Sequence, residues 1–296
     1  MHYLAMRSMC VAALTAMALS CAAVLARAEP VTQFPDTSRI VSIGGALTEI
    51  VYALGAEKML VARDDTSLYP PEALKLKSVG YMRRLSPESV LSVNPSGILL
   101  VEGSGPPETL DVLKKASVPM VIVPDKYTAE GVTAKIEAVG KALGLEDKAK
   151  VLAEKVSADL DAVEKRVSAH NPRKRVLFIL SMQGGRLMAS GTGTAADGII
   201  KLAGGVNVID QYPGYKQLTD EAIEKAAPDV ILMINNGGHS AASTELLKNP
   251  AIAETPAGRS GDIVAMDGLY LLGFGPRTGE AVRDLSEKLY GAADAK

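Results

Sequence analysis

The sequence predicts an α/β protein with two Rossmann-like lobes, each built on a parallel sheet, joined by a single long α-helix. Short apolar runs rich in β-formers alternate with helical patterns through both halves of the 296 residues, which is typical of parallel strands with right-handed crossovers. One segment recurs in similar form in each half, which indicates two lobes of similar construction. Between the halves, residues 146–169 form an uninterrupted helical pattern.

The first residues of the chain have the pattern of an export signal. A positive start at Arg7, an apolar run over 11–19 and an A-x-A site at 26–28 predict a signal peptide over residues 1–28. Cleavage is expected after Ala28, which places the mature protein in the periplasm. The apolar run is too short for a comfortable membrane span.

Composition excludes several classes of protein. Both cysteines, Cys10 and Cys21, lie in the predicted signal, so the mature chain needs neither a disulfide nor a thiolate metal site. A lipid anchor on Cys21 is the alternative, although Ala18 stands where such signals prefer Leu. Without residues 1–28, 30 basic residues face 34 acidic ones, a net charge near −4. This balance argues against a nucleic-acid binder, and we expect a soluble monomer.

The predicted N-terminal lobe covers residues 37–145. A first strand is expected at 39–43, followed by a helix over 48–55 that ends at Gly55. Further buried strands are expected at 98–101 and 120–123.

The predicted C-terminal lobe covers residues 171–294, with strands expected at 176–180, 230–234 and 263–266. The connecting helix is expected over residues 146–170 and would be about 36 Å long. Its apolar residues share one stripe at helical spacing: Leu152, Val156, Leu160, Val163 and Val167. A single long connector, unlike the strand crossovers of a flexible hinge, should permit only limited opening and closing of the lobes.

The repeated segment places one glutamate in each lobe. Residues 85–100 and 218–233 share a Leu-x-x-Glu-x-[Val/Ile] pattern followed by Pro and an apolar strand, and each has a Gly-Tyr pair just upstream. Glu88 and Glu221 each lie in the first turn of a predicted helix, in what reads as a capping box. Capping explains a glutamate at such a place, but not the recurrence of the whole segment.

These features resemble the helical-backbone class III substrate-binding proteins of ABC importers, which bind siderophores, cobalamin and haem. Residues 39–56 look like the N-terminal signature of this family, and the two Leu-x-x-Glu segments look like its permease-docking elements. The resemblance covers nearly the whole mature chain. It implies that Glu88 and Glu221 each meet an arginine on one of the importer's two membrane subunits.

Within the family, three parts of the chain are similar to the haem-specific members: residues 79–83, residues 194–198 with 202–205, and residues 271–278. The resemblance implies that Tyr81 is the axial ligand of haem iron and that Arg83 supports it. It further implies a protein that takes haem b (hemin) as cargo, downstream of an outer-membrane haem receptor.

The chemistry of Tyr81 agrees with this assignment. A phenol ligates poorly until it is deprotonated, and its ordinary pKa is about 10. A guanidinium that donates to the phenol oxygen favours the phenolate, and tyrosinate favours ferric haem. Either Arg83 or Arg84 could also pair with a haem propionate.

The sequence leaves more than one role possible for Tyr215 and for a second iron ligand. Tyr215 heads the equivalent segment of the second lobe and could stack on the macrocycle, bind a propionate or simply pack. Some relatives carry a histidine after the strand at 176–180, where this chain has residues 181–185 without one. Met182 could ligate there through its thioether, but a buried methionine is more often core. The missing histidine also puts the binding of two stacked haems in doubt.

The sequence therefore predicts a periplasmic protein that captures haem between its lobes and delivers it to an ABC permease, and that is not an enzyme. One alternative keeps the fold and changes the cargo to a ferric siderophore or cobalamin. Another is a periplasmic chelatase-like enzyme, which would require an acid–base pair in the cleft that the sequence does not offer. Asp64 and Asp65 alone are too few ligands for a cation site.

Overall fold

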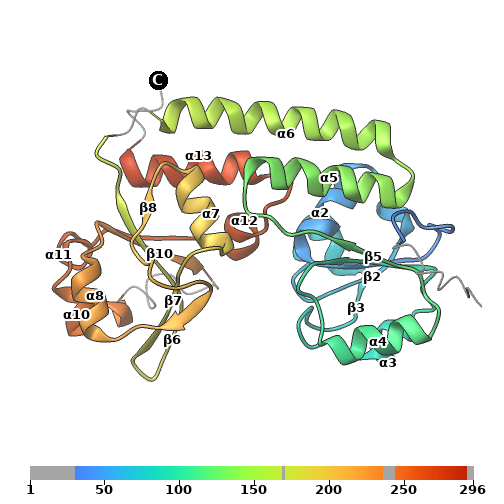
Figure 1. Ribbon diagram of the computed structural model, residues 1–296, viewed down its shortest axis with the longest axis horizontal. Coiled ribbons are helices and arrows are strands. Elements are labelled where there is room, and N and C mark those ends of the chain that lie inside the picture. Colours follow the sequence, from blue (N-terminus) through green and yellow to red (C-terminus); the bar gives the residue numbers. More distant parts are fainter. Residues whose placement is uncertain (1–30, 169–170, 236–243, 292–296) are drawn as a thin grey trace, which may run out of the picture. The chain divides into compact units, whose positions relative to one another are not determined.

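The computed structural model describes residues 31–168, 171–235 and 244–291 (Figure 1). The predicted signal peptide, its cleavage site and both cysteines lie outside these residues. Among the described residues, no helix combines the length and apolar character needed to cross a membrane.

The first sheet is entirely parallel and has the strand order β3-β2-β1-β4-β5. Its strands are β1 (Ile40–Ile43), β2 (Leu60–Arg63), β3 (Lys77–Ser78), β4 (Gly97–Val101) and β5 (Met120–Val123). The predicted strands at 39–43, 98–101 and 120–123 are confirmed. Every residue of β1 and β4 is buried, as expected for central parallel strands covered on both faces.

Four α-helices and two 3₁₀ turns accompany this sheet. They are α2 (Gly45–Ala53), η1 (Glu57–Met59), η2 (Pro71–Lys75), α3 (Pro87–Leu91), α4 (Pro107–Lys115) and α5 (Ala129–Leu143). The helix expected over 48–55 is therefore α2, which begins three residues earlier, just after Gly44. Gly44 has a φ of 119°, and a Cβ there would lie 2.8 Å from a methyl of Val101. The sharp turn from β1 into α2 therefore requires glycine.

The second sheet has the order β11-β10-β6-β7-β9, with β8 beside β6. Its strands are β6 (Arg175–Gln183), β7 (Arg186–Ser190), β8 (Val206–Asn207), β9 (Tyr215–Gln217), β10 (Val230–Asn235) and β11 (Ile263–Asp267). The predicted strands pair in parallel as β6, β10 and β11. Strands β7 and β9 are antiparallel additions that the sequence analysis did not predict.

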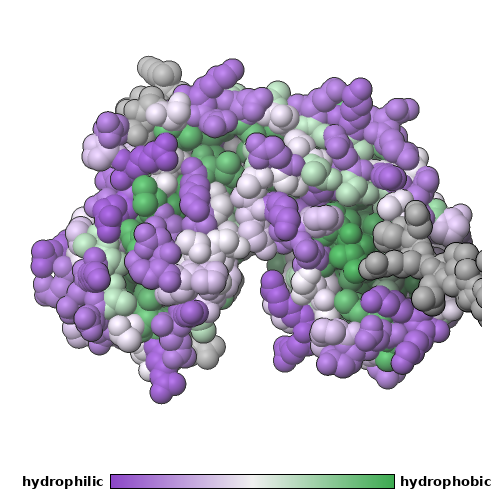
Figure 2. Space-filling model, in the orientation of Figure 1, coloured by the Kyte–Doolittle hydropathy of each residue, from purple (hydrophilic) through white to green (hydrophobic). Residues whose placement is uncertain are grey.

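The helices of the second half are α6 (Glu146–Val167), α7 (Ala195–Leu202), α8 (Asp220–Ala226), α10 (Pro250–Ala253), α11 (Pro256–Ser260), α12 (Gly268–Leu272) and α13 (Thr278–Tyr290). The predicted connector is thus one continuous helix, α6. Figure 2 shows its outer face covered largely by hydrophilic side chains. Its inner stripe is buried as predicted at Val156, Leu160, Val163 and Val167, whereas Leu152 is only partly buried.

Helix α6 packs against α5 and α13 (Figure 1). The contact with α5 is very close, because a Cβ at Gly140 would lie 2.1 Å from the Cβ of Ala149. In an isolated helix, replacing glycine with alanine would stabilise by about 1 kcal/mol. Here the steric overlap of an added Cβ with Ala149 outweighs that gain, so the close approach of α5 and α6 requires glycine at position 140.

We therefore expect Gly140→Ala to lower the free energy of unfolding by about 1–3 kcal/mol, because α5 and α6 must move apart. Urea unfolding followed by circular dichroism would measure the change. The exposed position Lys141 supplies the control, since Lys141→Ala changes the neighbouring residue on the same helix without entering the contact. A Gly140→Ala variant as stable as the parent protein would show that the helices separate without cost.

Two hydrophobic cores organise the described residues. The larger one runs from the first sheet through α5, α6 and α13 to α7 and one face of the second sheet, where it includes Phe178. The smaller one lies on the other face of the second sheet, beneath α8, α10 and α11, and includes Leu177 and Ile179. Alternate residues of β6 thus face different cores.

Two cations, the partly buried Arg277 and the fully buried Lys135, connect the segment between α12 and α13 to helices of the first sheet. The Arg277 guanidinium donates to both carboxylate oxygens of Glu49 on α2, at 3.0 and 2.8 Å. The ammonium of Lys135 on α5 lies 2.6 Å from Asp125 and donates to the Phe274 carbonyl at 3.1 Å. Residues 271–278, which resemble haem-specific relatives, therefore act here as part of the lobe junction.

Candidate functional site

Tyr81 lies on an exposed turn that buried neighbours hold in place. Val79, Met82 and Leu85 point into the core, with 2%, 8% and 4% of their surfaces exposed. Gly105 fixes the turn from the other side, because its N–H donates to the Met82 carbonyl and its own carbonyl accepts from the Leu85 N–H. The Tyr81 side chain lies between these buried positions and is itself partly buried, with its ring packed against the larger core.

The predicted pair Tyr81 and Arg83 is in contact. Arg83 Nη1 donates to the Tyr81 phenol oxygen at 2.9 Å. The Arg84 guanidinium lies 5.9 Å from the centre of the Tyr81 ring. Both arginines are exposed, so each has room to meet a carboxylate.

Two further tyrosines lie near the same guanidinium. Burial lowers the pKa of Arg83, but the hydrogen bond to Tyr81 and the nearby phenols of Tyr127 and Tyr215 together raise it above its ordinary value. Tyr127 follows β5, and Tyr215 begins β9 in the second sheet. We call Tyr81, Arg83 and the two phenols that act electrostatically on the Arg83 guanidinium, Tyr127 and Tyr215, the tyrosine cluster.

Tyr215 comes to the cluster from the edge of the second sheet. It pairs with Ser190 across β7 and β9, and its ring lies 6.5 Å from that of Phe178, edge to face. Burial raises the pKa of Tyr215, whereas Thr194, Ala196, Arg83 and Ser190 act to lower it. Its side chain remains 37% exposed, so it can still contact a ligand.

Tyr127 was missed by the sequence analysis. Its hydroxyl donates to Asp125 at 3.0 Å, and its ring packs edge to face on Phe274 at 5.2 Å. Burial raises its pKa strongly, and the adjacent Asp125 carboxylate raises it further. Tyr127 is therefore a neutral phenol with a fixed orientation, unlike Tyr81, whose oxygen accepts from a guanidinium.

Met182 is not part of the tyrosine cluster. An irregularity in the pairing of β6 with β7, between Ile179 and Ser181, changes which side chains share a face. As a result Met182 packs on the smaller core with Leu177 and Ile179, whereas Tyr215 packs with Phe178 on the opposite face. Met182 is thus a partly buried residue beside the smaller core, and its role as a haem ligand stays a prediction.

Residues 194–198 form the N-cap and first turn of α7, which packs against Tyr127 of the tyrosine cluster. The Thr194 side chain caps the helix by accepting from the Asp197 N–H. A Cβ at Gly198 would lie 2.5 Å from the Tyr127 carbonyl oxygen, so glycine there lets α7 approach Tyr127. The likeness of this segment to haem-specific relatives thus has a packing explanation.

Asp197 anchors this region by accepting from three groups: Gly193 N–H at 3.0 Å, Lys201 Nζ at 2.7 Å and Asn207 Nδ2 at 3.1 Å. Burial acts to raise its pKa, but the hydrogen bonds from Lys201, Gly193 and Asn207 outweigh burial and lower it. A folded-state pKa below the unfolded value gives stability at neutral pH. That stability is lost as the pH falls from about 4 through the lowered folded-state pKa.

We expect Asp197→Asn to lower the free energy of unfolding at pH 7 by about 1–3 kcal/mol. The same variant should lose less stability than the parent protein as the pH is lowered below about 4, because it lacks the titrating group. Urea unfolding at several pH values would test both effects, with exposed Asp161→Asn as the control. Parallel pH profiles for parent and variant would contradict the role of Asp197.

Glu88 and Glu221 are exposed on short helices, α3 and α8. Ser86 and Thr219 are the N-caps and accept from the N–H groups of Ser89 and Ala222. The predicted capping box is wrong, because each glutamate lies at the second helical position and not the third. Neither carboxylate closes a box: Glu88 instead accepts from the Ser86 hydroxyl at 2.5 Å, and both glutamate side chains remain exposed to solvent.

The two glutamate-bearing helices are held in the same way. Arg39 donates to the carbonyls of Val93 and Asn94, at 2.5 and 2.9 Å, just after α3. Arg175 donates to the equivalent carbonyls of Ala226 and Ala227, at 2.7 and 3.4 Å, at the end of α8. Asn94 and Ala227 both have positive φ, 47° and 40°. The internal repeat therefore extends to an arginine clamp in each lobe.

Asp64 has a structural role. It is fully buried and accepts from Gly44 N–H at 2.9 Å, from the Ser67 hydroxyl at 2.7 Å and from both the N–H and hydroxyl of Thr66. These bonds fix the turn into α2. Across residues 31–168, 171–235 and 244–291, no group of three or more His, Cys, Asp or Glu side chains could hold a metal ion.

Comparisons with known proteins agree on one family. Residues 40–269 match the family described as periplasmic binding protein. A Bacillus subtilis protein, the uncharacterized ABC transporter substrate-binding lipoprotein YvrC, is 30% identical over 88% of this chain and 83% of its own. The vitamin B12-binding protein of Pectobacterium atrosepticum is 27% identical over 72% of this chain and 77% of its own.

A solved structure of the periplasmic heme-binding protein BhuT, in complex with two hemes, matches the fold. Its TM-score is 0.81 and its sequence is 38% identical, over 85% of this chain and 97% of that chain.

Proposed function

Because the chain belongs to the periplasmic binding protein family, whose members bind substrates for ABC transporters, we propose that its own substrate is haem. In this proposal the protein captures ferric haem b (hemin) in the periplasm and delivers it to an ABC permease. The observation that carries the proposal is the 2.9 Å hydrogen bond from Arg83 to the phenol oxygen of Tyr81. It places a guanidinium donor beside a partly exposed phenol oxygen, and an oxygen ligand of this kind suits ferric iron.

The rest of the tyrosine cluster suits a flat, apolar ligand with two carboxylates. Tyr127, in the connection after β5, and Tyr215, on β9, offer aromatic rings from two parts of the fold, and Arg84 offers a second guanidinium for a propionate. Capture, and not catalysis, is the expected activity, since a phenol–guanidinium pair binds iron without supplying a proton relay. Glu88 and Glu221 would dock the loaded protein on basic residues of the two permease subunits.

Cobalamin is the second candidate, because a vitamin B12-binding protein is among the relatives. The identity to that protein is lower than to the heme-binding protein BhuT, 27% against 38%. Cobalamin also has no need of a phenolate beside an arginine. We therefore favour haem.

Titration of the mature protein with hemin, followed by absorption spectroscopy, tests the proposal. We expect saturable binding and the spectrum of a ferric tyrosinate complex. A parallel titration with cyanocobalamin should show no binding. Saturable binding of cyanocobalamin without hemin binding would replace haem by the second candidate, and binding of neither would leave the proposal without support.

A further inference from the structure

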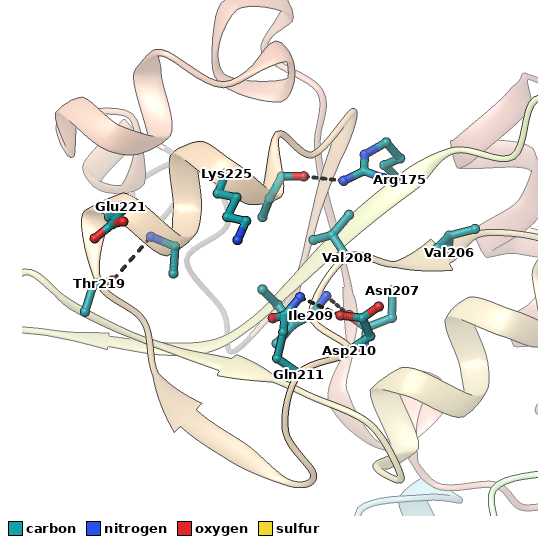
Figure 3. A pocket seen from close by; sticks show the side chains of 12 residues that line it. Arg175, Val206, Asn207, Val208, Ile209, Asp210, Gln211, Thr219, Glu221 and Lys225 are labelled. Carbon is teal, nitrogen blue, oxygen red and sulfur yellow. Dashed lines mark hydrogen bonds between the residues drawn. The ribbon is translucent and has the colours of Figure 1, made fainter.

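A pocket lies beside Glu221, away from the tyrosine cluster. It has a volume of about 460 Å³ and is bounded by α8 on one side and by residues 206–211 on the other (Figure 3). Its floor is apolar, because Val208 and Ile209 line it with 7% and 2% of their surfaces exposed. Its rim is charged and includes Glu221 and Lys225.

Glu221 and Lys225, the two charged residues of α8 on the rim, do not form an ion pair with each other. A glutamate four residues before a lysine on one helix is well placed for an ion pair. Among the residues that the structure describes, however, neither Glu221 nor Lys225 takes part in an ion pair within 4.0 Å. Figure 3 shows the Lys225 side chain pointing from α8 toward the segment of residues 208–211, and the Glu221 carboxylate at the other, N-terminal end of α8. Both charges are thus available to a partner.

The neighbouring basic group is occupied. Arg175 also lines the pocket, but its guanidinium is committed to the carbonyls of Ala226 and Ala227. Lys225 is therefore the cation that an incoming anionic group would meet.

The other lobe lacks this arrangement. The residue equivalent to Lys225 is Ser92, whose hydroxyl accepts from Lys77 on β3 at 3.0 Å. The chain between β2 and Gly80, residues 64–79, includes η2 and β3. The corresponding connection in the second lobe, residues 208–213, is much shorter and forms neither element. The space beside α8 is left open by this shorter connection.

We propose that this pocket receives a loop of one permease subunit, which presents a basic side chain to Glu221, an acidic side chain to Lys225 and an apolar side chain to the floor. The inference rests on the proposed docking role of Glu221 and extends it. Because the rim carries both a negative charge, Glu221, and a positive charge, Lys225, a loop with complementary charges can bind in one orientation only. The apolar floor adds buried hydrophobic surface at the centre of the contact. The N-terminal lobe would then dock through Glu88 on a flatter surface.

The test uses the hemin-loaded protein and its purified permease–ATPase complex in nanodiscs, with binding measured by biolayer interferometry. We expect Lys225→Glu to weaken binding about tenfold or more, because it repels the acidic side chain. Ala222→Leu should weaken binding as well, because Ala222 lines the pocket and the larger side chain fills it. The control Lys288→Glu makes the same charge change on exposed α13 and should leave binding unchanged.

Hemin titration of each variant must remain unchanged, which separates docking from capture. If Glu221→Ala weakens binding while Lys225→Glu and Ala222→Leu do not, docking stands and the pocket proposal falls. If Glu221→Ala also has no effect, the docking role itself is wrong. A change in oligomeric state on size-exclusion chromatography, without a change in permease binding, would assign the pocket to a second copy of this chain and overturn the proposal.

Discussion

Tyr81→Phe is expected to abolish the ferric tyrosinate spectrum of the hemin complex and to weaken hemin binding by about tenfold or more. The substitution removes only the phenol oxygen, so the ring still packs and the turn held by Met82 and Leu85 is unchanged. Without that oxygen, iron loses its anionic ligand and Arg83 loses its acceptor. Absorption spectra and hemin titration of the purified variant would measure both effects.

Tyr52→Phe provides the matched control, because Tyr52 packs against the core on α2 and lies outside the tyrosine cluster. An unchanged spectrum in Tyr81→Phe would show that another group binds the iron. Arg83→Met refines the test. It removes the hydrogen bond to the phenol oxygen and should weaken hemin binding, while the tyrosinate spectrum is retained because the oxygen ligand is still present.

Lys135→Met is expected to produce the largest loss of stability, about 3–5 kcal/mol in the free energy of unfolding. The Lys135 side chain is fully buried, and its ammonium is bound to Asp125 and to the Phe274 carbonyl. Its removal leaves the partly buried Asp125 carboxylate without its cation. Urea unfolding monitored by circular dichroism would measure the change.

Lys141→Met is the control for this experiment, since Lys141 lies on the same helix but is exposed. The double variant Lys135→Met with Asp125→Asn should recover part of the loss, because the uncompensated charge is removed as well. Equal stabilities of Lys135→Met and the parent protein would mean that water replaces the lost ammonium. The variant should also disturb Tyr127, which donates to the same carboxylate.

The central strands and the connecting helix could be predicted because their signals are local. Fully buried runs such as Ile98–Val101 contain nothing but apolar residues, and the stripe of α6 recurs at helical spacing. Strand β9 could not be predicted in the same way. It is three residues long, has no buried residue and begins at Tyr215, so alternation of buried and exposed residues has no room to appear.

The residues of the candidate site also differ in whether a local sequence pattern could predict them. Tyr81 and Arg83 are two residues apart, so their contact could be anticipated from a short pattern. Tyr127 joins the cluster through the fold alone and stands in no motif. The sheet face of Met182 depends on a pairing irregularity that no periodicity reveals.

One further signal was present in the sequence. Arg39 stands immediately before β1 and Arg175 is the first residue of β6, and each donates to carbonyls at the end of its own lobe's glutamate-bearing helix. Extending the repeat upstream by one strand would have found them. The capping-box prediction failed by a single position, which only the observed N-caps at Ser86 and Thr219 could decide.

If the protein docks through Glu88 and Glu221 as proposed, the arginine clamps bear on how the importer distinguishes the loaded protein from the unloaded one. Each clamp joins residues of one lobe to carbonyls of the same lobe, so neither depends on anything held between them. The unloaded protein should accordingly display both glutamates in the same local geometry and compete with the loaded form for the transporter. Discrimination would then fall to the spacing of the two helices or to a step after contact, such as ATP hydrolysis.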